Sequence, residues 1–213
     1  MVKKHTATVY TSDKAEGFEL TFEPVEDTIK VTKTDTGYTV KYATSDDDGI
    51  DPRDDDNRGI MAFFHSRYNL GDKDHGVNKD DYSSWGAMEK ALVKHGAYMV
   101  IPVFMYDHSG ITIRAGHGFG DIDSAGWDWG QIGFIYVTKE KVLKEYKKLG
   151  KKTRDTVKKV LLGEIETYDL YLRGESYGIV SETYDNEKVQ IDHDSCWGCL
   201  GIESVEEIMK EEE

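Results

Sequence analysis

The chain has 213 residues, of which 38% are hydrophobic, so it can form one domain, or one domain with an attachment, around a true core. Its 41 acidic and 27 basic residues give a formal net charge of −14 at pH 7, which repels nucleic-acid phosphates and favours metal cations or basic protein surfaces. Direct nucleic-acid binding is therefore not expected unless the fold gathers a local basic patch.

The first part of the chain is predicted to be β structure. Residues 5–44 alternate apolar with polar side chains, as in TATVYTS and YTVKYAT, which is typical of strands with one wet face. We expect residues 1–34 to form a β extension of a single domain over residues 35–213. The N-terminus lacks the apolar core of a signal peptide, and no apolar run is long enough to span a membrane. We therefore expect a cytoplasmic protein without a membrane partner.

An acidic loop follows, SDDDGIDPRDDDNRG, at residues 45–59. Its aspartates are two and three residues apart, as in calcium loops, although Arg58 and His65 break the EF-hand pattern counted from Asp54. The loop is either a solvated surface for a basic partner or a calcium site, and no other cofactor is expected. The partner-binding candidates are Asp46, Asp47, Asp48, Asp51, Asp54, Asp55 and Asp56, and the calcium candidates are Asp46, Asp48, Asp51, Asp54 and Asp56.

The middle of the chain mixes strands with one helix. IMAFFHSRY, from residue 60, resembles a buried strand, and residues 80–96 place Trp85, Met88 and Leu92 at helical spacing before a glycine cap. AYMVIPVFMYD, at residues 97–107, is the most apolar strand, and DHSG turns it into a hairpin with GITIRA.

The second half begins with a glycine-rich segment, residues 116–131. No helix follows its G-x-G-x-G, so the pattern favours close backbone packing near Trp127 and Trp129 over a phosphate loop. IGFIYVT is a strand, and residues 139–150 and 153–174 are amphipathic helices. We expect Glu164 and Glu166 to lie on the solvated face of the second helix.

The chain ends with strands SYGIVSETYD and KVQI, a loop DHDSCWGCLG and a short acidic helix. Because strands and helices follow without regular alternation, we predict an α+β fold, with a mainly antiparallel sheet packed with two to three amphipathic helices.

Several proton-handling side chains fall at predicted strand ends and turns, where sites commonly form. A catalytic interpretation uses His65, Arg67, Asp107, His108, Ser109 and Cys196, with Cys196 as a nucleophile and His108 as its base. The alternative is that these polar residues only cap turns. Cys196 and Cys199 are compatible with a redox pair, with half of a zinc site that includes His193, or with two separate thiols.

Five segments, in order, resemble a family of small proteins encoded by bacteriophages and prophages: PRDDDNRGIMAFFHSRYNLGD, PVFMYDHSGITI, WDWGQIGFIYVTKEKV, EIETYDLYLRGESYGIV and DSCWG. The resemblance covers residues 38–201 and implies a phage origin and an accessory role in the cytoplasm of the infected host. It carries over no catalytic residues. FGDIDSAGWDWGQ departs from the family pattern, which has a cysteine and a shorter loop there.

Charge and resemblance together lead to a first functional hypothesis. The protein is expected to be a non-catalytic acidic inhibitor that mimics nucleic acid and binds a basic host protein, with a host defence nuclease as the natural target. The alternatives are a small hydrolase or nucleotide-processing enzyme that uses His108 and Cys196, and a calcium-stabilised structural protein. The oligomeric state does not follow from the sequence.

Overall fold

The computed structural model describes residues 5–11, 16–22, 25 and 28–210, the first two ranges by their backbone alone. The chain divides into two compact units: unit 1 comprises residues 1–50 and 174–213, and unit 2 comprises residues 51–173. This division differs from the expected boundary at residue 34. The physical reason is strand pairing, because β4, before the acidic loop, pairs with β9, which follows the last helix of unit 2.

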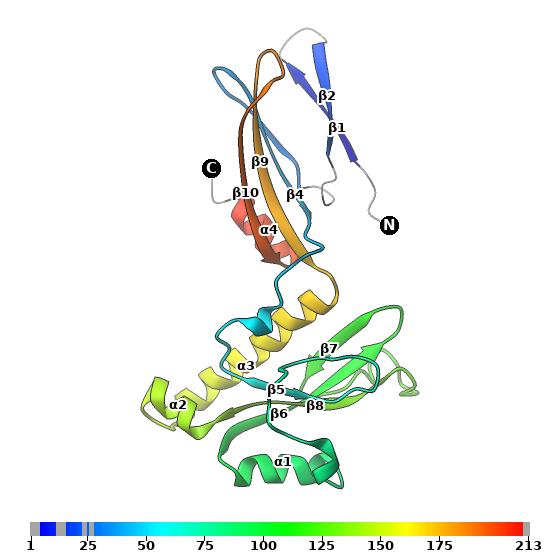
Figure 1. Ribbon diagram of the computed structural model, residues 1–213, viewed down its shortest axis with the longest axis vertical. Coiled ribbons are helices and arrows are strands. Elements are labelled where there is room, and N and C mark those ends of the chain that lie inside the picture. Colours follow the sequence, from blue (N-terminus) through cyan, green and yellow to red (C-terminus); the bar gives the residue numbers. More distant parts are fainter. Residues whose placement is uncertain (1–4, 12–15, 23–24, 26–27, 211–213) are drawn as a thin grey trace. The chain divides into compact units, whose positions relative to one another are not determined.

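Unit 2 is built on an antiparallel sheet of four strands (Figure 1). The central strand β6 alternates buried and half-buried residues, so side chains from both of its faces are covered. In sheet order the strands are β5 (Ile60–Phe63), β8 (Trp129–Thr138), β6 (Ala97–Asp107) and β7 (Ile111–Ala115).

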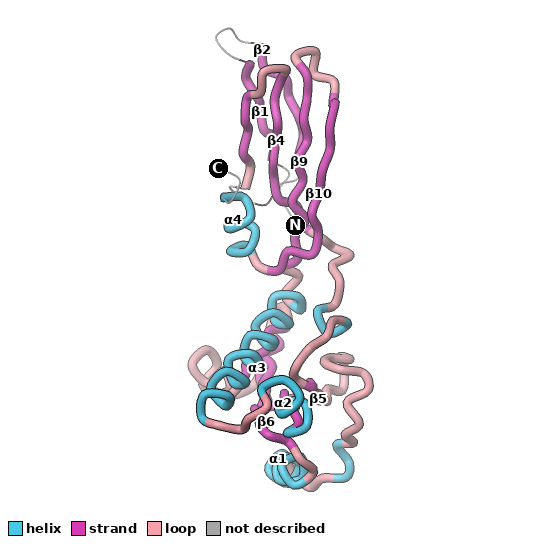
Figure 2. Tube along the Cα trace, turned by 90° about the vertical axis from the view of Figure 1, so that its left-hand side faces the viewer, coloured by secondary structure: helices cyan, strands magenta, loops and turns pink. Residues whose placement is uncertain are grey.

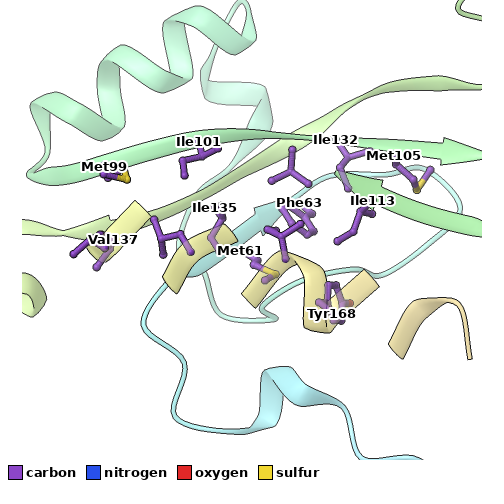
Figure 3. Packing of buried hydrophobic residues seen from close by; sticks show 14 of the residues in the cluster. Met61, Phe63, Met99, Ile101, Met105, Ile113, Ile132, Ile135, Val137 and Tyr168 are labelled. Atoms are coloured by element: carbon purple, nitrogen blue, oxygen red, sulfur yellow. The ribbon is translucent and has the colours of Figure 1, made fainter. Parts of the chain in front are cut away.

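Helices cover both faces of this sheet. On one face Met88 and Leu92 of α1 pack with Phe134 and Tyr136 of β8. On the other, α3 contributes a buried stripe against the main core, part of which is drawn in Figure 3. The unit is therefore a helix–sheet–helix sandwich. Its helices are α1 (Trp85–Lys94), α2 (Lys139–Tyr146) and α3 (Lys151–Leu172), with short 3-10 turns η1 (Pro52–Asp54) and η2 (Lys79–Asp81).

The described residues of unit 1 form a second antiparallel sheet and one helix. The helix α4 (Ile202–Lys210) lies beside β9 and β10 (Figure 2), where its Val205 packs with Ala43 and Ile179. The hairpin of β1 (His5–Thr11) and β2 (Glu16–Phe22) forms its own two-stranded sheet. In sheet order the four other strands are β10 (Gln190–Leu200), β9 (Ser176–Asp185), β4 (Gly37–Ser45) and β3 (Lys30–Lys33).

The predicted α+β class with antiparallel pairing is confirmed, but the strands form separate sheets. The clearest difference from the expected elements is near the end of the chain, because residues 192–200 of the predicted loop DHDSCWGCLG belong to the strand β10. Residues 186–198 are exposed, so β10 shows no apolar–polar alternation from which a strand is read. No helix among the described residues is long and apolar enough to cross a membrane.

Candidate functional site

The predicted hairpin at the end of the central strand is confirmed, and it brings the expected polar residues to one end of the unit 2 sheet. β6 ends at Asp107 and pairs with β7 after a tight turn in which the His108 N–H donates to the carbonyl of Gly110. Ser109 has a φ of 61°, so the turn places a non-glycine residue in the left-handed conformation. It is exposed at the tip.

An open cleft of about 390 Å³ lies at this end of the sheet. It is neither purely apolar nor purely polar, and it contains cations, carboxylates and two indole rings. Trp127 is 87% exposed at this cleft. The lining residues are Phe64, His65, Ser66, Arg67, Lys79, Met105, Asp107, Trp127, Asp128, Trp129, Gly130, Gln131 and Ile132.

Three of the predicted catalytic residues therefore meet at the cleft. The guanidinium of Arg67 forms an ion pair with the Asp107 carboxylate and lies 5.4 Å from the centre of the Tyr68 ring. The His65 ring stacks on the Tyr68 ring, with 5.1 Å between the ring centres. The His65 Nδ1 accepts a hydrogen bond from the backbone N–H of Arg67 at 3.3 Å. Because Asp107 is already paired with Arg67, it does not orient His108.

Asp128 is the carboxylate that contacts His108, with 2.8 Å between its Oδ2 and the imidazole Nδ1. The His108 ring also stacks on Tyr106 at 5.8 Å and is otherwise exposed. A histidine held in this way through Nδ1 leaves Nε2 free to exchange a proton with a bound molecule. The sequence analysis missed this pair because the two residues are twenty positions apart and meet only through the hairpin and the glycine-rich loop.

Asp123 shapes the loop that delivers Asp128 and Trp127. Its carboxylate accepts the backbone N–H groups of Ala125, Gly126, Trp127 and Asp128 at 2.7 to 3.1 Å. These hydrogen bonds, led by that from Asp128, hold the pKa of Asp123 below its ordinary value.

The glycine-rich segment packs closely, as expected. A Cβ at Gly118 would overlap the ring of Trp129, whose indole N–H donates to the carbonyl of Asp123 at 2.8 Å.

Cys196, the predicted nucleophile, belongs to β10 of unit 1, whereas His108 belongs to unit 2. Neither unit by itself contains the predicted pair. Burial, and then the neighbouring Cys196, raise the pKa of the Cys199 thiol, which makes it a poorer nucleophile at neutral pH. Among the described residues, no group of three or more His, Cys, Asp or Glu side chains is placed to hold a metal ion.

The aspartates of the acidic loop have separate structural roles. Asp46 accepts from the Ser176 hydroxyl at 3.4 Å in unit 1, and Asp51 caps η1 by accepting the Arg53 N–H at 2.8 Å in unit 2. Asp47, Asp48, Asp54, Asp55 and Asp56 are exposed. Calcium binding by this loop stays a prediction, and a melting temperature that rises with excess calcium and falls with chelator would support it.

The net negative charge of the chain belongs to one unit. Unit 1 contains 22 acidic and 8 basic residues, whereas unit 2 contains 19 of each. In the described part of unit 1, six of the nine exposed carboxylates lie on β10, the turn before it and α4: Glu187, Asp192, Asp194, Glu203, Glu206 and Glu207. The other three are Asp35, Asp47 and Asp48.

A buried ion network at Arg53 is a further feature that the sequence analysis missed. The Arg53 side chain is 4% exposed, and it donates to both carboxylate oxygens of Asp72, at 2.8 and 3.0 Å, and to Glu164 at 3.1 Å. Glu164 also accepts the backbone N–H groups of Arg58 and Gly59. The prediction that Glu164 lies on a solvated face is therefore wrong. These contacts tie the loop before β5 to α3, so the network stabilises unit 2.

Comparison of the chain with protein-family models, with curated proteins and with solved structures found no match.

Proposed function

We propose that the protein is a non-catalytic accessory protein whose acidic unit 1 occupies the nucleic-acid-binding surface of a basic host protein, with a defence nuclease as the expected class of target. The observation that carries the proposal is the charge separation, with 22 acidic against 8 basic residues in unit 1 and equal numbers in unit 2. The resemblance to phage-encoded proteins supports the same role.

The geometry of β10 suits such contacts. Asp192 and Asp194 lie on the same side of this edge strand, about 7 Å apart by strand geometry. Carboxylate oxygens accept hydrogen bonds from Lys and Arg much as phosphate oxygens do. An edge strand also leaves backbone groups on its open side for a partner. A basic groove that normally holds phosphates would therefore meet both charge and hydrogen-bond acceptors.

The test is capture of a partner from nuclease-treated bacterial extract with the tagged full chain, at low and high salt. We expect one stoichiometric basic protein that is lost at high salt. In a second step, the purified partner should lose its nucleic-acid binding when the chain is added.

Charge variants locate the surface. Asp192→Asn with Asp194→Asn should weaken the complex about tenfold, since each surface charge contact contributes up to about 1 kcal/mol. Asp80→Asn with Asp81→Asn, an exposed pair of unit 2, is the matched control and should have little effect. Asp55→Asn with Asp56→Asn tests the acidic loop in the same way. A partner that continues to bind nucleic acid in the presence of the chain would refute the mimicry.

The His108–Asp128 pair favours a second candidate, a small hydrolase or nucleotide-processing enzyme. In it His108 Nε2 would remove a proton from a water molecule, and Asp128, which lines the cleft although His108 itself does not, would fix the imidazole orientation. Arg67 and Lys79 would attract an anionic substrate.

This alternative predicts hydrolysis of simple phosphodiester or ester substrates that disappears in His108→Gln. His117→Gln, which changes another exposed histidine, should keep the activity. Equal rates for the two variants would remove His108 from the reaction.

A further inference from the structure

Residues 139–159 form a basic surface in unit 2, and nothing in the proposed function uses it. The segment comprises α2, the turn that follows it and the first two turns of α3, and it contains ten basic residues against three acidic ones. We call it the α2–α3 basic surface. Its cations are Lys139, Lys141, Lys144, Lys147, Lys148, Lys151, Lys152, Arg154, Lys158 and Lys159.

These cations are available to a partner. All except Lys141 are exposed, and Lys141 donates to the carbonyl of Asn57 at 2.5 Å. None of the nine exposed cations forms an ion pair with another residue that the structure describes. Glu145, one of the three acidic residues, is itself paired with Arg58 at 3.0 Å. The positive field of the surface is therefore not neutralised locally.

The start of α3 adds a suitable place for an anion. Gly150 is the N-cap and supplies no side-chain hydrogen bond, so no cap side chain occupies the N–H groups of the first turn. Beside it, a hollow of about 520 Å³ is lined by Lys151, Lys152, Asp155, Thr156 and Lys159. Lysines, free N–H groups and the positive end of the helix thus converge on one spot.

We propose that the α2–α3 basic surface binds the phosphate backbone of a nucleic-acid duplex. From Lys151 to Lys159 the helix rises about 12 Å, and over that length each strand of a duplex has about three to four phosphates. An acidic protein surface has fewer negative charges per unit length, and basic side chains lie between them. The charge density of a duplex therefore matches the density of these lysines better than that of an acidic protein. The overall charge of −14 does not oppose this, because the excess of acidic residues belongs to unit 1.

The composition of the surface favours a duplex over a single strand or a membrane. Tyr146 is the one aromatic residue in the segment and is half-buried, so bases find no stacking platform. Leu143 and Leu149 are its exposed large apolar residues, which is less than the broad apolar face of a membrane-surface helix. Since nine of the ten cations are lysines, we expect binding without base preference.

The test uses the full chain and a fluorescent 24-base-pair DNA duplex of arbitrary sequence, with anisotropy measured from 20 to 200 mM salt. We expect a micromolar Kd at low salt that weakens steeply as salt rises. Lys152→Gln with Lys159→Gln should weaken binding at least tenfold and reduce the slope of log K against log salt by about 2. Lys90→Gln with Lys94→Gln, two exposed lysines of α1, is the matched control and should leave both quantities unchanged.

Three outcomes would overturn the proposal. The first is no duplex binding at 20 mM salt, and the second is an equal loss in both double variants. The third is selective binding of another occupant through the same lysines: vesicles of anionic lipid, or a second copy of this chain seen as a salt-sensitive dimer in sedimentation. Because the experiment contains no host protein, its result is independent of the proposed inhibition.

Discussion

At the scale of single residues, unit 2 depends on polar groups that are buried and paired. Arg53 lies between Asp72 and Glu164, whose side chains are 23% and 12% exposed. Asp72 additionally accepts the Met61 N–H at 3.0 Å, which ties the network to the first residues of β5. A guanidinium suits this place because its fork donates to both oxygens of one carboxylate and still reaches a second.

Arg53→Ala should destabilise the protein by about 3 to 5 kcal/mol, because two carboxylates would remain in a partly buried site without their cation. Arg53→Lys keeps the charge but loses the fork, so a smaller loss is expected. Urea unfolding followed by circular dichroism measures both. A loss below about 1 kcal/mol for Arg53→Ala would mean that water replaces the guanidinium.

His75 should make stability fall in mildly acidic solution. Burial lowers its pKa, partly offset by Asp72, and its Nδ1 accepts the Val77 N–H at 3.1 Å, which a protonated ring cannot do. The unfolded chain therefore takes up the proton more readily, and stability is present above about pH 6.5 and lost as pH falls through the folded pKa.

His75→Asn keeps an acceptor for Val77 and removes the titration. Its melting temperature should fall less than that of the wild type between pH 7.5 and 5.5. His117→Asn, at an exposed histidine, should follow the wild type. Identical curves for all three proteins would exclude His75 as the titrating group.

At the scale of elements, the unit 2 sheet depends on a close approach between β5 and β8. Gly133 pairs with Phe63 on one side and Val103 on the other, next to a register shift in the ladder between β6 and β8. A Cβ at this position would overlap the carbonyl oxygen of Ala62. The irregularity lets Ile132 and Ile135 both reach the main core.

Gly133→Ala should therefore lower the free energy of unfolding by more than about 2 kcal/mol. Gly130→Ala lies on the same strand, where an added methyl group meets no atom within 4 Å, and it should change stability by less than about 0.5 kcal/mol. Thermal and urea unfolding of the pair provide the comparison. Equal stability of the two variants would show that the strands separate at little cost.

The strand β10 shows why one element was not predicted. A strand is read from alternation between a buried and a solvated face, but Gln190 to Gly198 are exposed throughout. The residue types Asp, His, Ser and Gly also have turn preferences. Pairing with β9, across the short turn at residues 186–189, decides the conformation here, and the burial pattern of the segment by itself does not reveal it.

At the scale of the whole molecule, charge follows the division into units. The acidic excess belongs to residues 1–50 and 174–213, and the neutral unit 2 has nine of its thirteen lysines in residues 139–159. A single chain thus presents an acidic surface in unit 1 and a basic surface in unit 2, which the net charge of −14 conceals. The run of basic residues was visible in the sequence, but only the fold shows that all except Lys141 are exposed, without an ion pair among the residues that the structure describes.

Unit 2 is one continuous segment with clusters of buried residues on both faces of its sheet, so residues 51–173 should fold alone. We expect the fragment to unfold cooperatively, to keep a helix–sheet circular dichroism spectrum, and to elute from an anion exchanger well before the full chain. A fragment without a cooperative transition would show that unit 2 needs residues of unit 1.

The sequence by itself determined the α+β class, the hairpin after Asp107, the helices of unit 2 and the acidic character of the chain, because periodicity, turn residues and composition are local properties. Only the tertiary structure decided the partners of the polar groups. His108 meets Asp128 across 20 positions and Arg53 meets Glu164 across 111, and such contacts depend on how strands and helices stack. The tertiary structure also decided that β4 pairs with β9, although the whole of unit 2 separates these strands in the sequence. The reason is that strand pairing is selected by long-range packing.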